Sequence, residues 1–155
     1  MRILIAAVGR GRSGPEQALF DAYRGRLSWP VTLKEVEERR KLPAAQLMLR
    51  EGELLLAALP TSRAGLFVVA LDPRGKALAS EDLARRLADW RDRGTDTLAF
   101  LIGGAEGHSE AMRQRADFLL SFGPMTWPHL LARAMLAEQL YRAQQILAGH
   151  PYHRG

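Results

Sequence analysis

The last six residues of the chain, HPYHRG, concentrate groups that can move a proton or hold an anion. The segment His150–Gly155 contains two imidazoles, one phenol and one guanidinium. Imidazole gains or loses a proton near neutral pH, and the planar guanidinium binds anions through several parallel donors. A disordered polar chain end is the competing interpretation, because termini often behave that way. The segment therefore indicates a proton-transfer or anion-binding site if the fold holds it in place.

A second group of candidates surrounds two adjacent glycines. Gly103 and Gly104 follow the apolar run Thr97–Ile102, and Glu106 and Gly107 complete a short turn. Because glycine has no side chain, a ligand can lie directly against the backbone there, and the glutamate could orient a ribose hydroxyl or a cation. A tight turn that needs a positive φ, with its glutamate in solvent, explains the same spacing equally well.

The nine residues Ser121–His129, SFGPMTWPH, predict a stiff loop that leads into a long helix. Two prolines and a glycine restrict its backbone, and its phenylalanine, methionine and tryptophan could enclose an aromatic or thioether ligand. Burial in the core is the more usual position for such residue types. The histidine at the helix start is either a base or a capping residue, and the positive helix end disfavours its charged form.

The segment Gly9–Gly14, GRGRSG, fits the dinucleotide-binding pattern G-x-G-x-x-G. It follows an apolar run, precedes a helix, and is followed by Glu35 and Glu37 where a ribose-binding acid would lie. Against this, Pro15 directly after the last glycine marks the start of a helix, and the chain is too short for two nucleotide-binding halves. A flexible glycine- and arginine-rich loop is favoured, and an NADP-binding reductase remains the alternative.

These candidates must be positioned by alternating strands and helices. Apolar runs predict strands at residues 3–8, 31–36, 66–71, 97–102 and 117–122. Helices are expected to begin at Pro15 and Pro43, after the potential caps Ser80 and Ser109, and over His129–Leu147. Such alternation predicts an α/β fold in one domain, 1–155, with a mainly parallel sheet and helices on both faces. Ligands bind beyond the carboxyl ends of such strands, which points to loops 9–14, 72–79, 103–108 and 123–128.

Charge and composition narrow the class of protein. The 155 residues include 22 basic and 17 acidic side chains, and the net charge is +5. The excess lies at the two ends of the chain and is mostly arginine, which favours a polyanionic partner, although base composition or thermal adaptation would also enrich arginine. The chain has no cysteine, which excludes a disulfide framework and thiolate metal sites. No apolar run would span a bilayer and no signal peptide is evident, so we expect a soluble cytoplasmic protein without a metal.

The predicted last helix is apolar on most of its circumference. A helix of this kind needs cover on more than one side. In a small domain a second copy of the chain would supply that cover most easily, so the sequence predicts a homodimer that uses this helix.

Several of these motifs, in this order, resemble the ribosomal RNA large subunit methyltransferase H family over the whole chain. The matching segments are Leu71-Asp72 with Gly75-Lys76, Ile102-Gly103-Gly104 with Glu106-Gly107, Met125–His129, Tyr141-Arg142-Ala143 and Tyr152-His153-Arg154. The resemblance implies a SPOUT-type α/β fold with a trefoil knot near the C-terminus. It also implies an S-adenosylmethionine-dependent enzyme that methylates N3 of a pseudouridine in 23S rRNA, acting as a homodimer on the ribosome and without a metal.

The resemblance assigns roles to individual residues. Cofactor binding is implied for Leu71, Gly103, Phe122, Gly123, Pro124, Met125, Thr126 and Trp127. A place in the catalytic site is implied for Tyr152, His153, Arg154 and His129, and RNA contacts are expected from Arg133, Arg142 and Arg154. His108 departs from the family pattern, which places an aliphatic residue there.

The chemistry that these residues allow is a direct methyl transfer in which His153, or else His129, accepts the N3 proton. Arg154 would stabilise negative charge on the neighbouring carbonyls. Besides the NADP-binding reductase, a basic ribosome-binding module without enzymatic activity remains an alternative.

Overall fold

The computed structural model describes residues 1–154 and contains one five-stranded sheet whose neighbouring strands are all parallel. The strand order is β2-β1-β4-β3-β5. The strands are β1 (Arg2–Val8), β2 (Val31–Val36), β3 (Leu66–Ala77), β4 (Thr97–Ile102) and β5 (Phe118–Ser121). The predicted parallel α/β class is confirmed.

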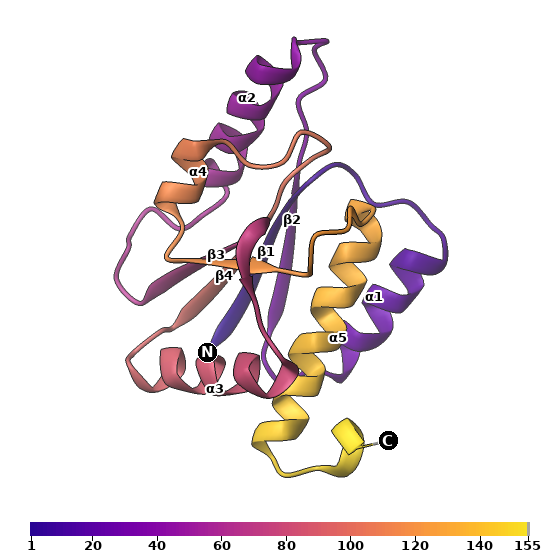
Figure 1. Ribbon diagram of the computed structural model, residues 1–155, viewed down its shortest axis with the longest axis vertical. Coiled ribbons are helices and arrows are strands. Elements are labelled where there is room, and N and C mark those ends of the chain that lie inside the picture. Colours follow the sequence, from indigo (N-terminus) through magenta and orange to yellow (C-terminus); the bar gives the residue numbers. More distant parts are fainter. Residues whose placement is uncertain (155) are drawn as a thin grey trace.

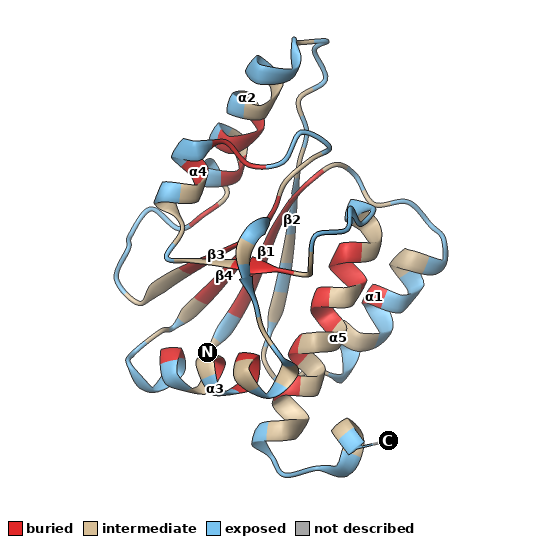
Figure 2. Cartoon of the chain, viewed as in Figure 1, coloured by how far each residue is buried: buried red, intermediate tan, exposed pale blue. Residues whose placement is uncertain are grey.

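Helices cover both faces of this sheet (Figure 1). They are α1 (Pro15–Arg26), α2 (Ala44–Ala57), α3 (Ser80–Asp92), α4 (Glu110–Arg115) and α5 (His129–Leu147), followed by the short 3₁₀ turn η1 (Pro151–Arg154). In β1, Ile3 and Ile5 pack toward α1, α3 and α5, whereas Leu4 and Ala6 pack toward α2 and α4. Successive side chains on a strand point to opposite faces, so a strand covered on both sides is a continuous apolar run. Figure 2 shows this buried centre in the middle strands.

Strand β3 is longer than its apolar run predicts. The segment 72–79 was expected to be a loop, but pairing resumes and the strand ends only at Ala77. Both Leu71 and Lys76 pair with Leu120 of β5, so the residues between them bulge out of the ladder. A Cβ on Gly75 would lie 2.5 Å from the carbonyl carbon of Leu119, which only glycine avoids. The extension depends on β5, a contact between distant segments, and local sequence gives no sign of it.

The two serine caps behave differently. The Oγ of Ser109 accepts a hydrogen bond from the Met112 N–H at 3.2 Å, as a helix cap does, which confirms that prediction. The cap predicted at Ser80 is wrong: the helix is preceded by Ala79, and the Ser80 hydroxyl donates instead to Oε1 of Gln139 on α5 at 2.7 Å.

Helix α5 finds most of its cover inside its own chain. It packs against α1 and α3 and over the sheet, so that Leu136, Leu140 and Ala143 are fully buried. Of its large apolar side chains only Leu147 is substantially exposed. The apolar circumference therefore does not by itself require a partner subunit, and the homodimer remains a prediction, as does the trefoil knot.

Candidate functional site

A cavity of about 920 Å³ opens at the carboxyl edge of the sheet. Its walls come from the segments that follow β3, β4 and β5, where parallel sheets bind ligands. Most of the residues implied for cofactor binding and one implied for catalysis line it: Leu71, Gly103, Phe122, Gly123, Met125, Thr126, Trp127 and His129. Pro124 lies in the same loop but is exposed and does not line the cavity.

The glycine turn forms one wall of this cavity. Its ends are tied by a hydrogen bond from the Gly107 N–H to the Gly104 carbonyl at 3.0 Å, and Gly107 has a φ of +76°. A Cβ on Gly103 would lie 3.2 Å from both the carbonyl carbon of Gly107 and Cε1 of His108. The segment is therefore the tight turn with a positive φ that one interpretation predicts, and it also lines the cavity, while ligand binding at this turn stays a prediction.

His108 fills the position where an aliphatic residue was expected. It is 6% exposed, and its Nε2 lies 3.2 Å from the Leu101 carbonyl oxygen. Burial lowers the pKa of His108, which favours the neutral ring. Nε2 therefore donates to the Leu101 carbonyl. The imidazole supports the glycine turn from beneath, as a packing residue would.

Glu51 of α2 is a buried carboxyl that the sequence analysis missed. It is 8% exposed, and both carboxylate oxygens would be 2.9 Å from a Cβ on Gly104. Its Oε1 has no hydrogen-bond partner among residues 1–154. Burial, reinforced by the charge of Glu106, raises the pKa of Glu51. The signal was available, because Glu51 shares a helical face with Leu47 and Leu55 at four-residue spacing.

The loop between β5 and α5 is held by its own hydrogen bonds. The Ser121 Oγ accepts from the Gly123 N–H at 3.0 Å, and the indole Nε1 of Trp127 donates to the Phe122 carbonyl at 3.1 Å. Gly123 has a φ of +97°. Met125 is 70% exposed and Trp127 39% exposed, so their interpretation as core residues is wrong. Both side chains stand at the rim of the cavity, where a ligand can reach them.

Arg133, which was expected to contact RNA, is buried. It is 1% exposed, its Nη1 lies 2.5 Å from Oε2 of Glu35, and its Nη2 donates to the Gly9 carbonyl at 3.0 Å. The same Glu35 oxygen accepts the Gly11 N–H at 2.5 Å. Although burial raises the pKa of Glu35, the hydrogen bonds from Arg133 and Gly11 lower it overall. The guanidinium is therefore unavailable to RNA, and we correct that expectation.

The same contacts argue against dinucleotide binding by the loop Gly9–Gly14. The ribose-binding acid proposed for it, Glu35, is engaged by Arg133, and the Gly11 N–H is engaged by Glu35. Both groups would have to leave these partners before they could bind a nucleotide.

The tail, meaning residues 150–154 at the end of the described chain, docks on its own chain, away from the cavity. The Tyr152 hydroxyl lies 3.1 Å from Oε1 of Glu138 and 3.4 Å from the hydroxyl of Tyr23. Burial raises the pKa of Tyr152, and its hydrogen bond to Tyr23 and the charge of Glu138 raise it further. Glu138 and Arg142 are 9 and 13 residues beyond His129 on α5, which is roughly 14–20 Å along the helix. A single chain therefore does not bring the tail into the cavity.

Both ring nitrogens of His153 are occupied in the docked tail. Nδ1 lies 3.1 Å from Nη1 of Arg142, and Nε2 lies 2.7 Å from Oε1 of Glu81. Because guanidinium only donates, Nδ1 accepts that bond and Nε2 carries the proton given to Glu81. Arg142 is also tied to Glu138 at 2.6 Å. Docked in this way, His153 has no free lone pair with which to act as a base, whereas the Arg154 side chain is exposed.

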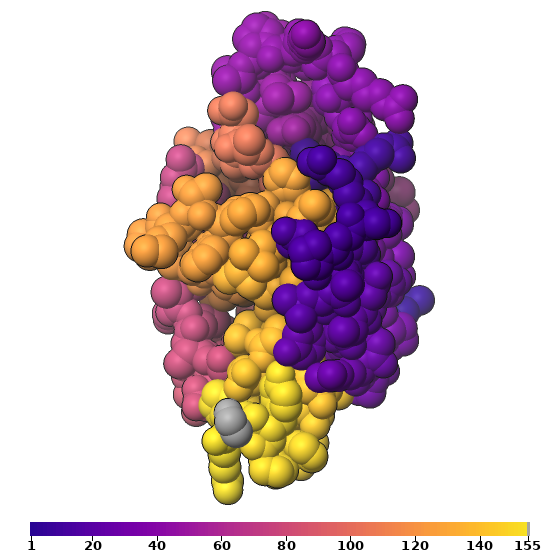
Figure 3. Space-filling view, turned by 90° about the vertical axis from the view of Figure 1, so that its right-hand side faces the viewer, coloured from indigo at the N-terminus to yellow at the C-terminus, as the bar shows by residue number. Residues whose placement is uncertain are grey.

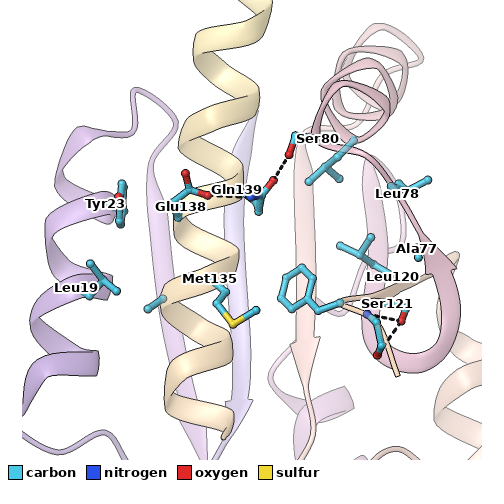
Figure 4. A pocket seen from close by; sticks show the side chains of 14 residues that line it. Leu19, Tyr23, Ala77, Leu78, Ser80, Leu120, Ser121, Met135, Glu138 and Gln139 are labelled. Atoms are coloured by element: carbon cyan, nitrogen blue, oxygen red, sulfur yellow. Dashed lines mark hydrogen bonds between the residues drawn. The ribbon is translucent and has the colours of Figure 1, made fainter. Parts of the chain in front are cut away.

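A second hollow, of about 570 Å³, lies between α1, α5 and the end of β3. Figure 4 shows Leu19 and Met135 in the lower part of this hollow and Tyr23 and Glu138 above them. Figure 3 shows α1 and α5 side by side on this face, with the tail below them. Phe122 and Gly123 line both hollows. This second hollow, called the groove below, therefore adjoins the cavity at Phe122 and Gly123, and two of its lining residues, Tyr23 and Glu138, contact Tyr152.

Two kinds of feature are absent from the part of the chain that the structure describes. Within residues 1–154, no group of three or more His, Cys, Asp or Glu side chains is arranged to hold a metal ion. None of the helices in this part of the chain combines the length and the apolar character needed to cross a bilayer.

Comparison with solved structures shows the fold. A probable methylase family protein from Haemophilus influenzae matches with a TM-score of 0.56 at 13% identity, covering 95% of this chain and 66% of that chain. The SpoU methyltransferase AviRb from Streptomyces viridochromogenes matches with a TM-score of 0.50 at 14% identity, covering 96% of this chain and 61% of that chain. At such identities the likeness concerns architecture alone.

Sequence comparison defines the family. The family model described as "Predicted SPOUT methyltransferase" matches residues 1–153. Proteins named ribosomal RNA large subunit methyltransferase H are 62% identical in Rhodospirillum centenum and 63% identical in Paramagnetospirillum magneticum, each over 154 residues and 99% of both chains. The chain is thus a SPOUT methyltransferase and belongs to the ribosomal RNA large subunit methyltransferase H family.

Proposed function

We propose that this enzyme transfers a methyl group from S-adenosylmethionine to N3 of a pseudouridine in the 23S rRNA of the large ribosomal subunit. The enzyme class follows from the family, and the relatives' names specify large-subunit rRNA for those proteins. The nucleotide and the atom come from the motif resemblance. The observation that carries the proposal is the cavity at the carboxyl edge, which gathers residues from three strand ends that the resemblance implies for the cofactor.

The cavity suits the proposed cofactor in shape and chemistry. Backbone at Gly103 and Gly104 is bare on one side, which lets an adenosine lie against peptide groups. Leu71 and Phe122 offer apolar surface, and the buried carboxylate of Asp72 lines the same space and can hold a cationic or hydroxyl group. The cofactor supplies an already activated methyl group, so the protein needs only to position it and to receive a proton.

The tail joins the reaction in this proposal only after it leaves its docked position. On release from Arg142, Nδ1 of His153 regains a lone pair and can accept the N3 proton, while Arg154 stabilises charge on the adjacent carbonyls. His129 already lines the cavity and is the second candidate for the base. Tyr152, Arg142 and Arg154 would contact RNA or the target base.

We further propose that the enzyme acts as a homodimer in which the tail of one copy serves the cavity of the other. The distance along α5 between the tail and His129 supports action across an interface. The groove between α1 and α5, with exposed Leu19 at its edge, offers apolar surface for the second copy. Light scattering at micromolar concentration tests this, and a 17.2 kDa monomer would contradict it.

The decisive experiment is methyl transfer to ribosomal particles from a strain lacking this protein. With radiolabelled S-adenosylmethionine we expect one methyl group per large subunit, which mass mapping of rRNA fragments should place on a pseudouridine. Labelling of another nucleotide would overturn the assigned target, and labelling of ribosomal proteins alone would overturn RNA as the substrate. Calorimetric titration with NADPH serves as the control for the rejected reductase, and no heat of binding is expected.

A further inference from the structure

We propose that Arg133 and Glu35 are a positioning pair that holds the loop after β1 against the first turn of α5 and so fixes the imidazole of His129 at the cavity wall. The inference deepens the proposed function, because it concerns how that methyltransferase site is built. It assigns to two residues outside the cavity a role in the orientation of one residue that lines it.

The pair joins three segments that are distant in sequence. Arg133 belongs to α5, Glu35 to β2, and Gly9 and Gly11 to the loop that follows β1. The guanidinium reaches Glu35 at 2.5 Å and the Gly9 carbonyl at 3.0 Å through separate nitrogens. Glu35 in turn receives the Gly11 N–H at 2.5 Å. The loop is thus held at two of its peptide groups, one by each member of the pair.

His129 rests against this loop. It lies four residues before Arg133, so the two side chains share one face of α5. A Cβ on Gly9 would be 3.4 Å from Nε2 of His129 and 3.6 Å from its Cδ2, which places the bare Gly9 backbone against the ring. Gly9 has a φ of +99°, a conformation that favours glycine. Because the Gly9 carbonyl is bound to Arg133, any shift of the guanidinium changes the surface on which the ring rests.

The energetics favour a geometric role over a stabilising one. The Arg133 side chain is 2% exposed, whereas that of Glu35 is 32% exposed, so much of the desolvation falls on the arginine. Arg133 Nε has no hydrogen-bond partner within residues 1–154, which adds to the free-energy cost of burying the guanidinium. Buried ion pairs of this kind contribute little net stability compared with well-packed apolar side chains. If apolar side chains replaced Arg133 and Glu35, the loop after β1 would lose the contacts that hold it in place.

The test compares Arg133→Met with Arg93→Met, which removes an exposed arginine paired with Asp89 far from the cavity. Imidazole ¹⁵N spectra report ring environment and tautomer, and His129→Gln identifies the His129 signals. We expect Arg133→Met to move or broaden the His129 signals and leave those of His153 unchanged. Single-turnover methylation should fall by roughly 10²-fold, as misplacement of about 1 Å can cause. Cofactor affinity should change less than threefold. Arg133→Lys should be intermediate, because its single ammonium nitrogen replaces the two guanidinium nitrogens that bind Glu35 and the Gly9 carbonyl.

Each outcome decides the proposal. If the His129 signals and turnover of Arg133→Met equal those of Arg93→Met, the positioning role is wrong. A lower melting temperature with unchanged His129 signals also overturns it, since that result marks a purely structural residue. Should Arg133→Met fail to fold, Glu35→Gln, which keeps the shape of the pair but removes its charge, is measured in the same way. If the wild-type enzyme methylates no particle, the proposed function fails, while the spectra still decide whether the pair orients His129.

Discussion

The two ends of helix α5 are both anchored by an arginine–glutamate pair, but in opposite ways. At the start of the helix, the Arg133 side chain is 2% exposed and its partner Glu35 is 32% exposed, and the buried guanidinium binds both that carboxylate and the Gly9 carbonyl of another segment. Toward its end, Arg142 pairs within the helix with Glu138, and both side chains remain partly exposed at 24% and 19%. The first pair fixes parts of the fold to one another, whereas the second presents a surface on which the tail docks.

In the proposed function, helix α5 carries a rigid half of the site around Arg133 and an exchangeable half around Arg142. Interactions that are buried and directed at backbone hold geometry and resist solvent. Contacts between partly exposed side chains are more accessible to water and each contribute less, which suits the proposed release of the short tail that they hold. The proposed function asks for fixed geometry at the cavity end, where the cofactor would bind, and for freedom at the tail end, where RNA would bind.

The largest effect, a loss of methyl-transfer rate, should come from removal of the tail. Deletion of Tyr152–Gly155 should leave a folded protein, because these residues add little to the core. Methyl transfer should fall ~10²–10⁴-fold, the usual effect of losing a positioned base. Single-turnover labelling of ribosomal particles measures the rate, and calorimetry should find cofactor affinity nearly unchanged. Near-normal turnover would reduce the tail to an inert chain end.

The next effect concerns cofactor affinity at the glycine turn that lines the cavity. Gly103→Val should weaken cofactor binding at least about tenfold, or about 1.4 kcal/mol, because the side chain intrudes where Gly107 and His108 already lie 3.2 Å away. Gly25→Val is the matched control, since a Cβ there meets nothing within 4 Å. Calorimetric titration with S-adenosylmethionine compares the two variants. Equal affinities would mean that the cofactor does not use the glycine turn.

Salt should weaken the contacts that hold the tail at Arg142 and Glu138 more than those that hold the loop after β1 at Arg133 and Glu35. Raising NaCl from 0.05 to 1 M screens exposed pairs more than buried ones. Hydrogen exchange of the Tyr152 amide, which donates to His150, should accelerate roughly three- to tenfold as the tail undocks. The Gly11 amide, bound to Glu35 beside the buried Arg133, should change less than about twofold. Equal acceleration at both amides would show that the anchors do not differ.

The smallest effect concerns Glu51, a buried carboxyl beside the cavity that has no ion-pair partner among residues 1–154. Because burial raises the pKa of Glu51, the folded state holds the carboxyl proton more tightly than the unfolded state does. The buried carboxyl therefore lowers the free energy of unfolding increasingly as pH rises above its pKa in the unfolded chain. Glu51→Gln should therefore gain about 1 kcal/mol over wild type at pH 8 and much less at pH 4.5. Urea unfolding at both pH values measures the difference. A gain independent of pH would contradict the titration argument.

The parts of this molecule that follow local rules were predictable from sequence. Helix α5 begins at His129 after a proline and ends before Gly149, whose φ of +72° suits a helix stop. Most residues that the resemblance implies for cofactor binding line one cavity because they follow strand ends, which share an edge in any parallel sheet. These features need only chain order and residue type.

The features that sequence reasoning missed depend on partners far along the chain. An arginine on an apolar helix resembles a surface residue, and only the approach of β2 and the β1 loop shows that Arg133 is buried. The tail's docking likewise depends on Tyr23 and Glu81, more than 70 residues away in sequence. Hydrophobic periodicity carries no information about such contacts between segments that are distant in sequence.

The double pairing of Leu120 limits how this sequence can change in length. Residues 72–75 bulge at the surface and two of them are well exposed, so they resemble a loop that could gain or lose a residue. However, β5 grips the chain on both sides of the bulge, at Leu71 and again at Lys76. A one-residue insertion or deletion would shift one of these registers and turn Lys76 and Ala77 to the opposite face. The bulge is therefore a fixed-length spacer, and length variation in relatives should fall elsewhere.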